Sequence, residues 1–313
     1  MSKLYNRTSW IYVCFFVSAT AAQVLLSLLL RRLGLLTEEN QAWISITVSC
    51  VSMYGVGFFL SKALFSLLPK GGGVQQEYWS LGKRILYFII CMSFMYIGNL
   101  IGNAMMFSVG VFTGKGMPTN QMTELLMESN VWLNLLSMVI LAPIVEEWLF
   151  RKLLLDRIAR FGQLPAVLLS AFFFALAHGN FYQFFYAFGL GALFAYLYVK
   201  TGKIRYPIEF HMAINFFGGI LAPELVKWQE RMAGRGPLFW AIPMMMLAAY
   251  GLLLIGCTIA GIVLLCCNVR QIHFLPARER EERGNVLLAL AKSPGFWVYL
   301  LYSAVILARS VMV

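Results

Sequence analysis

Long apolar runs separated by short polar connections dominate this chain. About nine of them are candidate membrane-spanning helices, because roughly 20 apolar residues in a helix cross ~30 Å of hydrocarbon. These runs are residues 10–30, 43–68, 85–112, 131–150, 164–178, 181–199, 206–221, 238–267 and 296–312. The pattern predicts an all-α fold, a polytopic transmembrane helical bundle of about eight or nine membrane helices. Runs 164–178 and 206–221 are short for a full span and have polar neighbours, which predicts a cavity between helices.

Composition supports a membrane protein. Of the 313 residues, 60% are hydrophobic and 12% are charged, and the mean hydropathy is +0.73. Charged side chains are therefore too few to cover the surface of a soluble globule of this size. The N-terminal segment lacks a small-residue cleavage site, so we interpret the first apolar run as a retained helix rather than a cleaved signal.

The charge distribution predicts an orientation. The chain carries 25 Lys and Arg against 14 Asp and Glu, a net charge of +11. Most of the basic residues fall in alternate connections, on the same side as the N-terminus, which the positive-inside rule places in the cytoplasm. The excess is explained by topology and by attraction to the lipid bilayer. No nucleic-acid-binding motif accompanies it, so we expect no nucleic-acid partner. The absence of organelle signals favours a bacterial plasma membrane.

A few ionisable residues interrupt the apolar runs. Glu146 and Glu147 stand near the end of the fourth run, and two of the three histidines, His178 and His211, also lie in apolar sequence. An ionisable side chain in a membrane segment is costly and usually faces a partner or a water-filled cavity. The pattern therefore predicts one site shared by these side chains. The six cysteines have no framework spacing and are assigned to packing.

Helical spacing indicates which acidic groups are neutralised, because residues four apart share a helix face. Glu147 precedes Arg151 by four residues, the favourable order for an ion pair, and is predicted to have a structural role. Glu146 then points to a different face without a local cation. Glu209 follows Arg205 at the same spacing and is interpreted as an ion-paired interfacial residue.

The same spacing groups the remaining polar residues. His211 and Asn215 are predicted to project together and to offer an imidazole and an amide to one point. Phe174 and His178 share a face in the same way, so the ring is expected to form a wall beside the imidazole.

Three motifs follow one another in these apolar helices. They are Glu146-Glu147-x-x-x-Arg151, Phe174-x-x-x-His178 and His211-x-x-x-Asn215. In this order the chain resembles the CPBP family (CAAX protease and bacteriocin-processing) of intramembrane endopeptidases, over roughly residues 131–221. The resemblance implies a catalytic helical core at 131–221. It would lie between N-terminal scaffold helices at 1–130 and C-terminal helices with a cytoplasmic loop at 222–313.

The resemblance also implies a reaction, the hydrolysis of peptide bonds in a membrane-associated peptide or protein substrate. Peptide hydrolysis needs an activated water, a proton carrier to the leaving amine and donors for the tetrahedral oxyanion. Carried over by resemblance, Glu146 and His178 would activate water, and His211 and Asn215 would stabilise the intermediate. Glu147, Arg151 and Phe174 would then be structural support.

Other readings stay open at this point. Zinc held by Glu146, His178 and His211 is the alternative cofactor, although these groups are dispersed on three helices, unlike the compact His-Glu-x-x-His helix. Asp156 is the only aspartate of the chain, which excludes a two-aspartate protease site. The alternatives to a protease are a proton- or ion-coupled transporter and a non-catalytic immunity or scaffold protein.

The depth of the groups sets a structural condition on the protease interpretation. Glu146 lies toward one end of its apolar run, whereas His178 ends a helix that starts on the same side. If the helix from Val131 continues to about Arg160 it is ~45 Å long at ~1.5 Å per residue, and the two depths agree. That requires Arg151 to be held inside the protein by Glu147.

Overall fold

The computed structural model describes residues 1–37, 39–277 and 284–312, and every regular element in these ranges is helical. The longer α-helices are α1 (Ser2–Arg32), α2 (Gln41–Cys50), α3 (Phe58–Ser66), α4 (Leu81–Thr113), α9 (Gln163–Ala177), α10 (Phe181–Thr201), α11 (Arg205–Phe216), α12 (Ala222–Met232), α13 (Pro237–Asn268) and α15 (Pro294–Met312). The shorter ones are α5 (Gln121–Glu128), α6 (Val131–Asn134), α7 (Ala142–Glu147), α8 (Leu154–Ile158) and α14 (Val286–Ala291). Wider π-helical turns η1 (Val51–Gly57), η2 (Leu135–Leu141), η3 (Trp148–Leu153) and η5 (Phe217–Leu221), and the 3-10 turns η4 (Ala159–Phe161) and η6 (Val269–Gln271), continue several of these helices.

The prediction of a polytopic helical bundle is confirmed. In the described ranges, seven continuous helices are long and apolar enough to cross a membrane, and the protein is an integral membrane protein. The predicted run 164–178 forms α9, which is short as expected. The predicted run 206–221 ends too early, because α11, η5 and α12 form one continuous helix. Its far end is charged, and Glu224 binds Lys227 at 2.8 Å along that helix.

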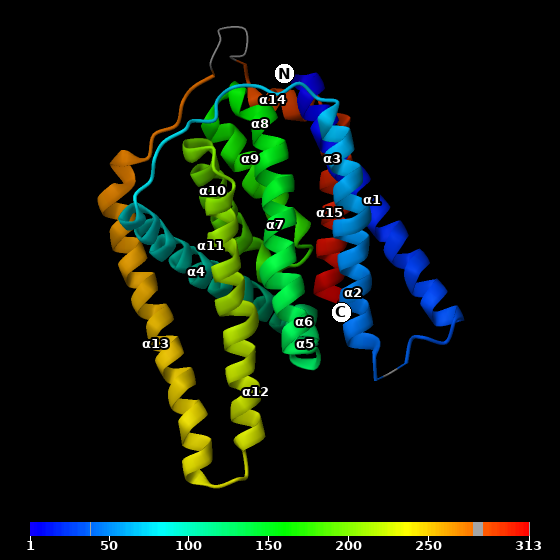
Figure 1. Cartoon of the computed structure of the whole chain (residues 1–313), viewed down its shortest axis with the longest axis vertical. Coiled ribbons are helices and arrows are strands. Elements are labelled where there is room, and N and C mark those ends of the chain that lie inside the picture. The colour runs from blue at the N-terminus through cyan, green and yellow to red at the C-terminus, as the bar shows by residue number, and fades with distance from the viewer. Residues whose placement is uncertain (38, 278–283, 313) are drawn as a thin grey trace.

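Successive helices run up and down the bundle in alternation (Figure 1). The N-terminus, the connection between α3 and α4 and the segment around α14 gather at one end, and the turn between α12 and α13 lies at the other. The described parts of the connection after α13, residues 272–277 and 284–293, lie at the N-terminal end and contain the short helix α14. Residues 278–283 of this connection are outside the described part of the chain.

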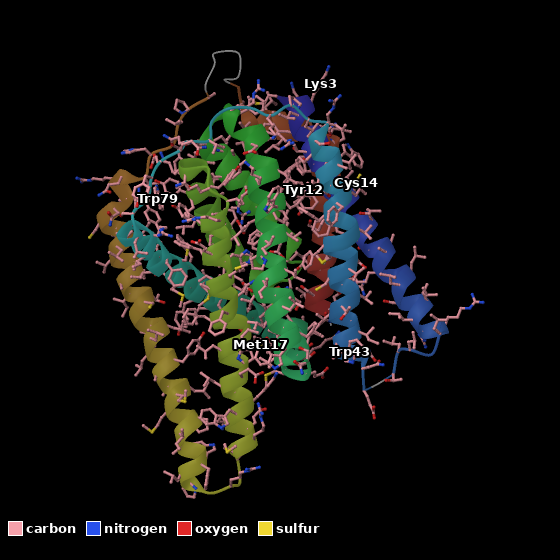
Figure 2. The ribbon with its side chains drawn as sticks, in the orientation of Figure 1. Lys3, Tyr12, Cys14, Trp43, Trp79 and Met117 are labelled. Carbon is pink, nitrogen blue, oxygen red and sulfur yellow. The ribbon has the colours of Figure 1, made fainter. Side chains whose placement is uncertain are left out.

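Aromatic packing joins α1 to the centre of the bundle. Tyr12 is fully buried between the helices (Figure 2), where its ring stacks on Phe150 at 5.2 Å and meets Phe173 edge-on at 5.0 Å. Its hydroxyl donates to the carbonyl of Leu149 at 3.1 Å, and the hydroxyl of Tyr299 donates to Phe173 at 2.9 Å. Both buried phenols thus have hydrogen-bond partners, as burial requires.

An extended segment, residues 69–79, crosses the N-terminal end of the bundle, and we refer to it as the strap. Its backbone is paired with the ends of two helices. The N–H of Gly71 donates to the backbone carbonyl of Asp156 at 2.7 Å. The N–H groups of Gln75 and Glu77 donate to the backbone carbonyls of Val199 and Lys200 at 2.7 and 2.9 Å. The strap therefore satisfies backbone groups that these helix ends leave open.

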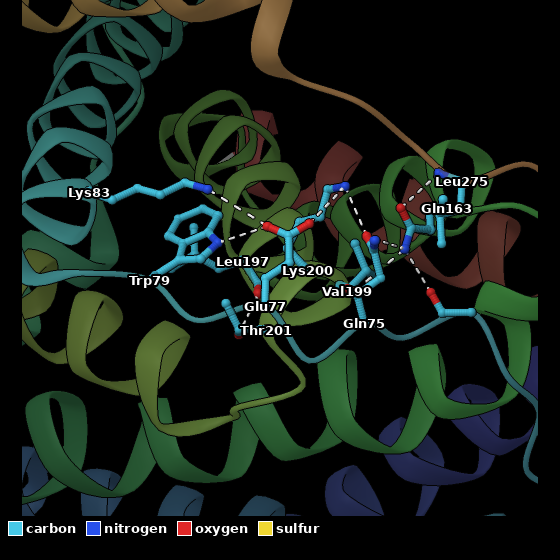
Figure 3. A network of polar contacts seen from close by, with 11 residues as sticks. Gln75, Glu77, Trp79, Lys83, Gln163, Leu197, Val199, Lys200, Thr201 and Leu275 are labelled. Carbon is cyan, nitrogen blue, oxygen red and sulfur yellow. Dashed lines mark hydrogen bonds and ion pairs between the residues drawn. The ribbon is translucent and has the colours of Figure 1, made fainter.

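Polar side chains reinforce the strap (Figure 3). Gln163 donates to the carbonyl of Gly73 at 2.7 Å and accepts from the N–H of Leu275 at 2.9 Å. Lys200 donates to Gln75 at 2.9 Å and forms an ion pair with Glu77 at 3.4 Å. This network joins the start of α9, the end of α10, the strap and the segment after α13.

Glycines allow α4 to approach α10 closely. A Cβ added at Gly98 would lie 2.4 Å from the Cα of Tyr186, and one at Gly102 would lie 2.8 Å from the carbonyl oxygens of Phe181 and Tyr182. Small residues four apart let helix backbones pack in contact, as is common in membranes. The first turns of α10 are therefore held directly against α4.

Candidate active site

The two glutamates lie in the middle of a long irregular helix, residues 131–161, built from α6, η2, α7, η3, α8 and η4. The wide turn η2 ends just before Ala142-Pro143, and η3 begins directly after Glu147. Proline lacks an N–H, so it disturbs the hydrogen bonding of the preceding turn. π-helical turns of this kind are rare and often occur at functional sites.

Glu147 is the buried centre of the charged cluster. Both Glu147 and Arg151 have fully buried side chains, and their Oε2 and Nε atoms are 3.0 Å apart. The other carboxylate oxygen faces two donors, Nδ1 of His211 at 3.0 Å and Nη2 of Arg151 at 3.4 Å. The predicted ion pair is present, and Glu147 also links the helix 131–161 to α11.

Arg151 is held by further contacts. Its Nη1 donates to Ser170 at 3.2 Å, and Ser170 donates in turn to the carbonyl of Phe150 at 2.7 Å. Its guanidinium lies 4.4 Å from the ring centroid of Phe174, an arrangement that favours the cation. Ser170 was not expected from the sequence, because a lone serine in an apolar run gives no signal of its partner.

Glu146 occupies a different face, as its position predicted. Its side chain keeps 22% of its surface accessible, and its Oε2 atom lies 3.9 Å from Nε2 of His211. His211 therefore stands between the two carboxylates, with Nδ1 toward Glu147 and Nε2 toward Glu146. Glu146 is the only one of the two that can reach a substrate or water without displacing Arg151.

His178 ends α9 and hydrogen-bonds within its own helix. Its Nδ1 atom lies 2.8 Å from the carbonyl oxygen of Phe174, one of the carbonyls that a helix C-terminus leaves without a backbone donor. A carbonyl only accepts, so Nδ1 carries the proton, and Nε2 of the neutral ring is left with a free lone pair. His178 and Glu146, both in the described part of the chain, are not joined by a direct ion pair or hydrogen bond.

The ring of Phe174 forms the wall between the two imidazoles. Its centroid lies 4.7 Å from that of His178 and 5.6 Å from that of His211, with both imidazoles nearly perpendicular to it. Phe194 of α10 stacks on His211 at 5.4 Å. Aromatic contacts thus fix the positions of both rings.

Asn215 is tied to the helix that carries the glutamates. Its amide donates to the carbonyl of Met138 at 2.8 Å. In a π-helical turn a carbonyl pairs with the N–H five residues later. For Met138 that residue is Pro143, which has no N–H. The amide therefore satisfies an acceptor that the proline leaves open and keeps its second N–H for another partner.

The depth condition set by the sequence is met. The helix continues from Val131 to Phe161, and Arg151 is enclosed with Glu147. Within the described residues, no three His, Cys, Asp or Glu side chains are grouped so that they could hold a metal ion. The arrangement of Glu146, His178 and His211 therefore does not match a zinc site, and no step below involves a metal.

The segment of the chain that holds this site is similar in sequence to known proteins. Residues 128–217 match the sequence model of a family described as type II CAAX prenyl endopeptidase Rce1-like. The chain is also 36% identical over 100 residues to the membrane-embedded CAAX protease MroQ of Staphylococcus aureus. This segment therefore resembles the CPBP family, and we call residues 128–217 the CPBP segment. All the motif residues from Glu146 to Asn215 lie within it, so the resemblance seen in the sequence is confirmed.

The similarity is confined to the core. The match with MroQ covers 28% of this chain and 40% of that protein. No solved structure matches the chain. The CPBP segment contains the helix 131–161, α9, α10 and α11. The helices around it lie outside the match with the family model.

Proposed function

We propose that this protein is an intramembrane endopeptidase of the CAAX type, with its catalytic core at residues 131–221. One observation carries the proposal: Glu147 holds Arg151 and His211 at 3.0 Å each, while Glu146 remains accessible beside them. In a peptidase the neutralised glutamate positions His211 and the accessible one activates water. The match of this segment to CAAX endopeptidases supports the same conclusion.

In the proposed reaction, Glu146 accepts a proton from a water molecule as the water oxygen attacks the peptide carbonyl. Nε2 of His178, which the bond to Phe174 leaves free, receives this proton through an intervening water, because no direct hydrogen bond joins His178 to Glu146. His178 then delivers it to the leaving nitrogen as the C–N bond breaks. One water is consumed: one of its protons reaches the leaving nitrogen, and the other stays on the new carboxylic acid until that acid ionises and the amine becomes an ammonium ion.

The oxyanion of the intermediate needs hydrogen-bond donors. Asn215 offers its second amide hydrogen. His211 donates its Nδ1–H to Glu147, so its Nε2 contributes a proton only when the ring is an imidazolium. Glu147 and Arg151 orient His211 and do not themselves touch the substrate.

The proposed setting is a bacterial plasma membrane with the N-terminus in the cytoplasm. The strap crosses the N-terminal end of the bundle, and Lys200 is bound to it, which agrees with the positive-inside rule for that orientation. The substrate class is a membrane-associated peptide or protein, which reaches the site from the bilayer.

The test is cleavage of an internally quenched peptide with a C-terminal CAAX sequence, prenylated or unprenylated on its cysteine, by detergent-purified protein. Glu146→Gln and His178→Ala should each lower kcat by about 10²–10⁴-fold, the usual contribution of acid–base groups. Glu209→Gln, in the exposed pair with Arg205, and His273→Ala, in an exposed segment, are matched controls and should retain activity.

Parallel reactions with a chelator test the metal alternative. Unchanged cleavage supports direct activation of water by the carboxylate, whereas loss that zinc restores would replace this mechanism by a metal-dependent one. A folded wild-type protein that cleaves no peptide of either kind would refute the proposal and favour the transporter or scaffold alternatives.

A further inference from the structure

Donors for the oxyanion are scarce in the proposed site. One amide hydrogen of Asn215 is bound to Met138, and the Nδ1–H of His211 is bound to Glu147. The Nδ1–H of His178 is bound to Phe174. A peptidase normally aims more than one preorganised donor at the developing negative charge. If the proposed reaction is correct, another side chain among the described residues around the site should donate a hydrogen bond to the oxyanion.

Tyr186 has the required chemistry and position. Its ring centroid lies 6.5 Å from that of His178, which places the phenol beside one of the proposed catalytic groups. The hydroxyl oxygen accepts a hydrogen bond from the side-chain amide of Gln183 at 2.7 Å. Its own proton is bound to no acceptor among the described residues. A phenol whose acceptor side is occupied presents its O–H as a donor.

A polar chain fixes the phenol relative to His178. The side-chain amide of Asn180 donates to the carbonyl of His178 at 2.9 Å and to Oε1 of Gln183 at 2.7 Å. Gln183 then donates from its amide nitrogen to Tyr186. Oδ1 of Asn180 caps α10 by accepting from the backbone N–H of Gln183 at 2.9 Å. Every link from the histidine to the phenol is therefore a hydrogen bond within residues 178–186.

The backbone of Tyr186 is fixed as well. It packs against Gly98 of α4, where even a methyl group would clash at 2.4 Å. The phenol thus depends on a helix outside the CPBP segment for its position. We propose that Tyr186 is a further catalytic residue, whose O–H donates a hydrogen bond to the oxyanion of the tetrahedral intermediate. This inference rests on the proposed endopeptidase function.

Substitution of Tyr186 by Phe removes only the hydroxyl and tests the inference directly. We expect kcat for the quenched CAAX peptide to fall about 100-fold with KM nearly unchanged, as for loss of one oxyanion donor. Tyr196→Phe, the same change in a buried tyrosine near the other end of α10, is the matched control and should keep wild-type kinetics. Circular dichroism and thermal unfolding of both variants check the fold.

Gln183→Ala provides a second and independent measurement. It removes the donor that orients the phenol but leaves the backbone cap of α10 in place. Alone it should lower kcat by about 10-fold, and added to Tyr186→Phe it should have little further effect, because residues that act as a unit are not additive.

Three outcomes would overturn the inference. The first is a Tyr186→Phe variant within twofold of wild type while Glu146→Gln is inactive. The second is an increase in KM at constant kcat, which would indicate ground-state binding only. The third is full additivity of the two substitutions. Failure of the proposed function itself is distinguishable, because the wild-type protein would then be inactive on the same peptides.

Discussion

Replacing Arg151 by methionine tests the buried ion pair on which the site is built. Methionine keeps an apolar stem but leaves the carboxylate of Glu147, which is fully buried, without the cation now 3.0 Å away. Removing one partner of a buried pair costs about 3–5 kcal/mol. The substitution also removes the hydrogen bond to Ser170 and the contact of the guanidinium with the ring of Phe174. We therefore expect the upper part of that range, about 4–5 kcal/mol.

Two comparisons separate the lost charge from the lost side chain. In the double variant Arg151→Met with Glu147→Gln the uncompensated charge is gone, so the cost should fall to about half of that of Arg151→Met alone. Arg205→Met makes the same substitution in the i,i+4 pair with Glu209, at 3.8 Å and with 66% and 48% of the two side chains exposed. An exposed pair of this kind contributes at most about 1 kcal/mol.

The assay is equilibrium unfolding in mixed micelles, with helix content and the fluorescence of the eight tryptophans as two independent probes. Coincident transitions justify a single free energy of unfolding. The reasoning would be refuted if Arg151→Met cost no more than Arg205→Met, or if neutralising Glu147 in addition made the protein still less stable.

Two further predictions concern the scaffold. Gly98→Leu should destabilise by about 1–3 kcal/mol and abolish cleavage, because its side chain would enter the backbone of Tyr186. Gly218→Leu, at a position where an added Cβ has no atom within 4 Å, should neither destabilise the protein nor abolish cleavage. Equal losses of thermal stability in the two variants would contradict the close approach of α4 to α10. In the strap, partial burial raises the pKa of Glu77, but the hydrogen bond from Trp79 and the ammonium groups of Lys200 and Lys83 outweigh it and lower the pKa overall. The stabilisation is therefore present at neutral pH, above the ordinary carboxylate pKa of about 4.3, and is lost as the pH falls through the lower folded-state value. Thermal midpoints measured from about pH 7 to pH 3 should fall less steeply in Glu77→Gln than in wild type, and parallel curves would exclude this contribution.

Much of the site could be predicted because its evidence is local. Ionisable residues in apolar helices are conspicuous, and helical spacing pairs Glu147 with Arg151 and separates Glu146 from both. The bonds of Nδ1 of His211 to Glu147 and of the Asn215 amide to Met138 could not be predicted, since they join segments 64 and 77 residues apart. They change the interpretation of both residues, because one N–H of each side chain is already used in a hydrogen bond within the protein and cannot donate to a substrate.

The scaffold was predictable in outline only. Apolar length located the membrane helices, but the helix 131–161 extends beyond its apolar run because Arg151 and Arg157 are buried and bound inside the protein. The pairing of the strap with the helix ends could not be predicted, since a short segment rich in glycine has the sequence of an ordinary connection. Tyr186 was missed because one tyrosine in an aromatic helix is indistinguishable from packing.

The strap also has a consequence for the order in which the protein assembles. The N–H groups of Gln75 and Glu77 obtain their acceptors from Val199 and Lys200, more than one hundred residues later in synthesis. Until α10 has entered the membrane, the connection after α3 stays hydrated and the first helices lack their final restraint. A ribosome stalled before residue 199 should therefore hold a protease-sensitive strap, and one stalled after α10 a protected strap. The N-terminal third of the protein thus completes its folding only when about two thirds of the chain has been made.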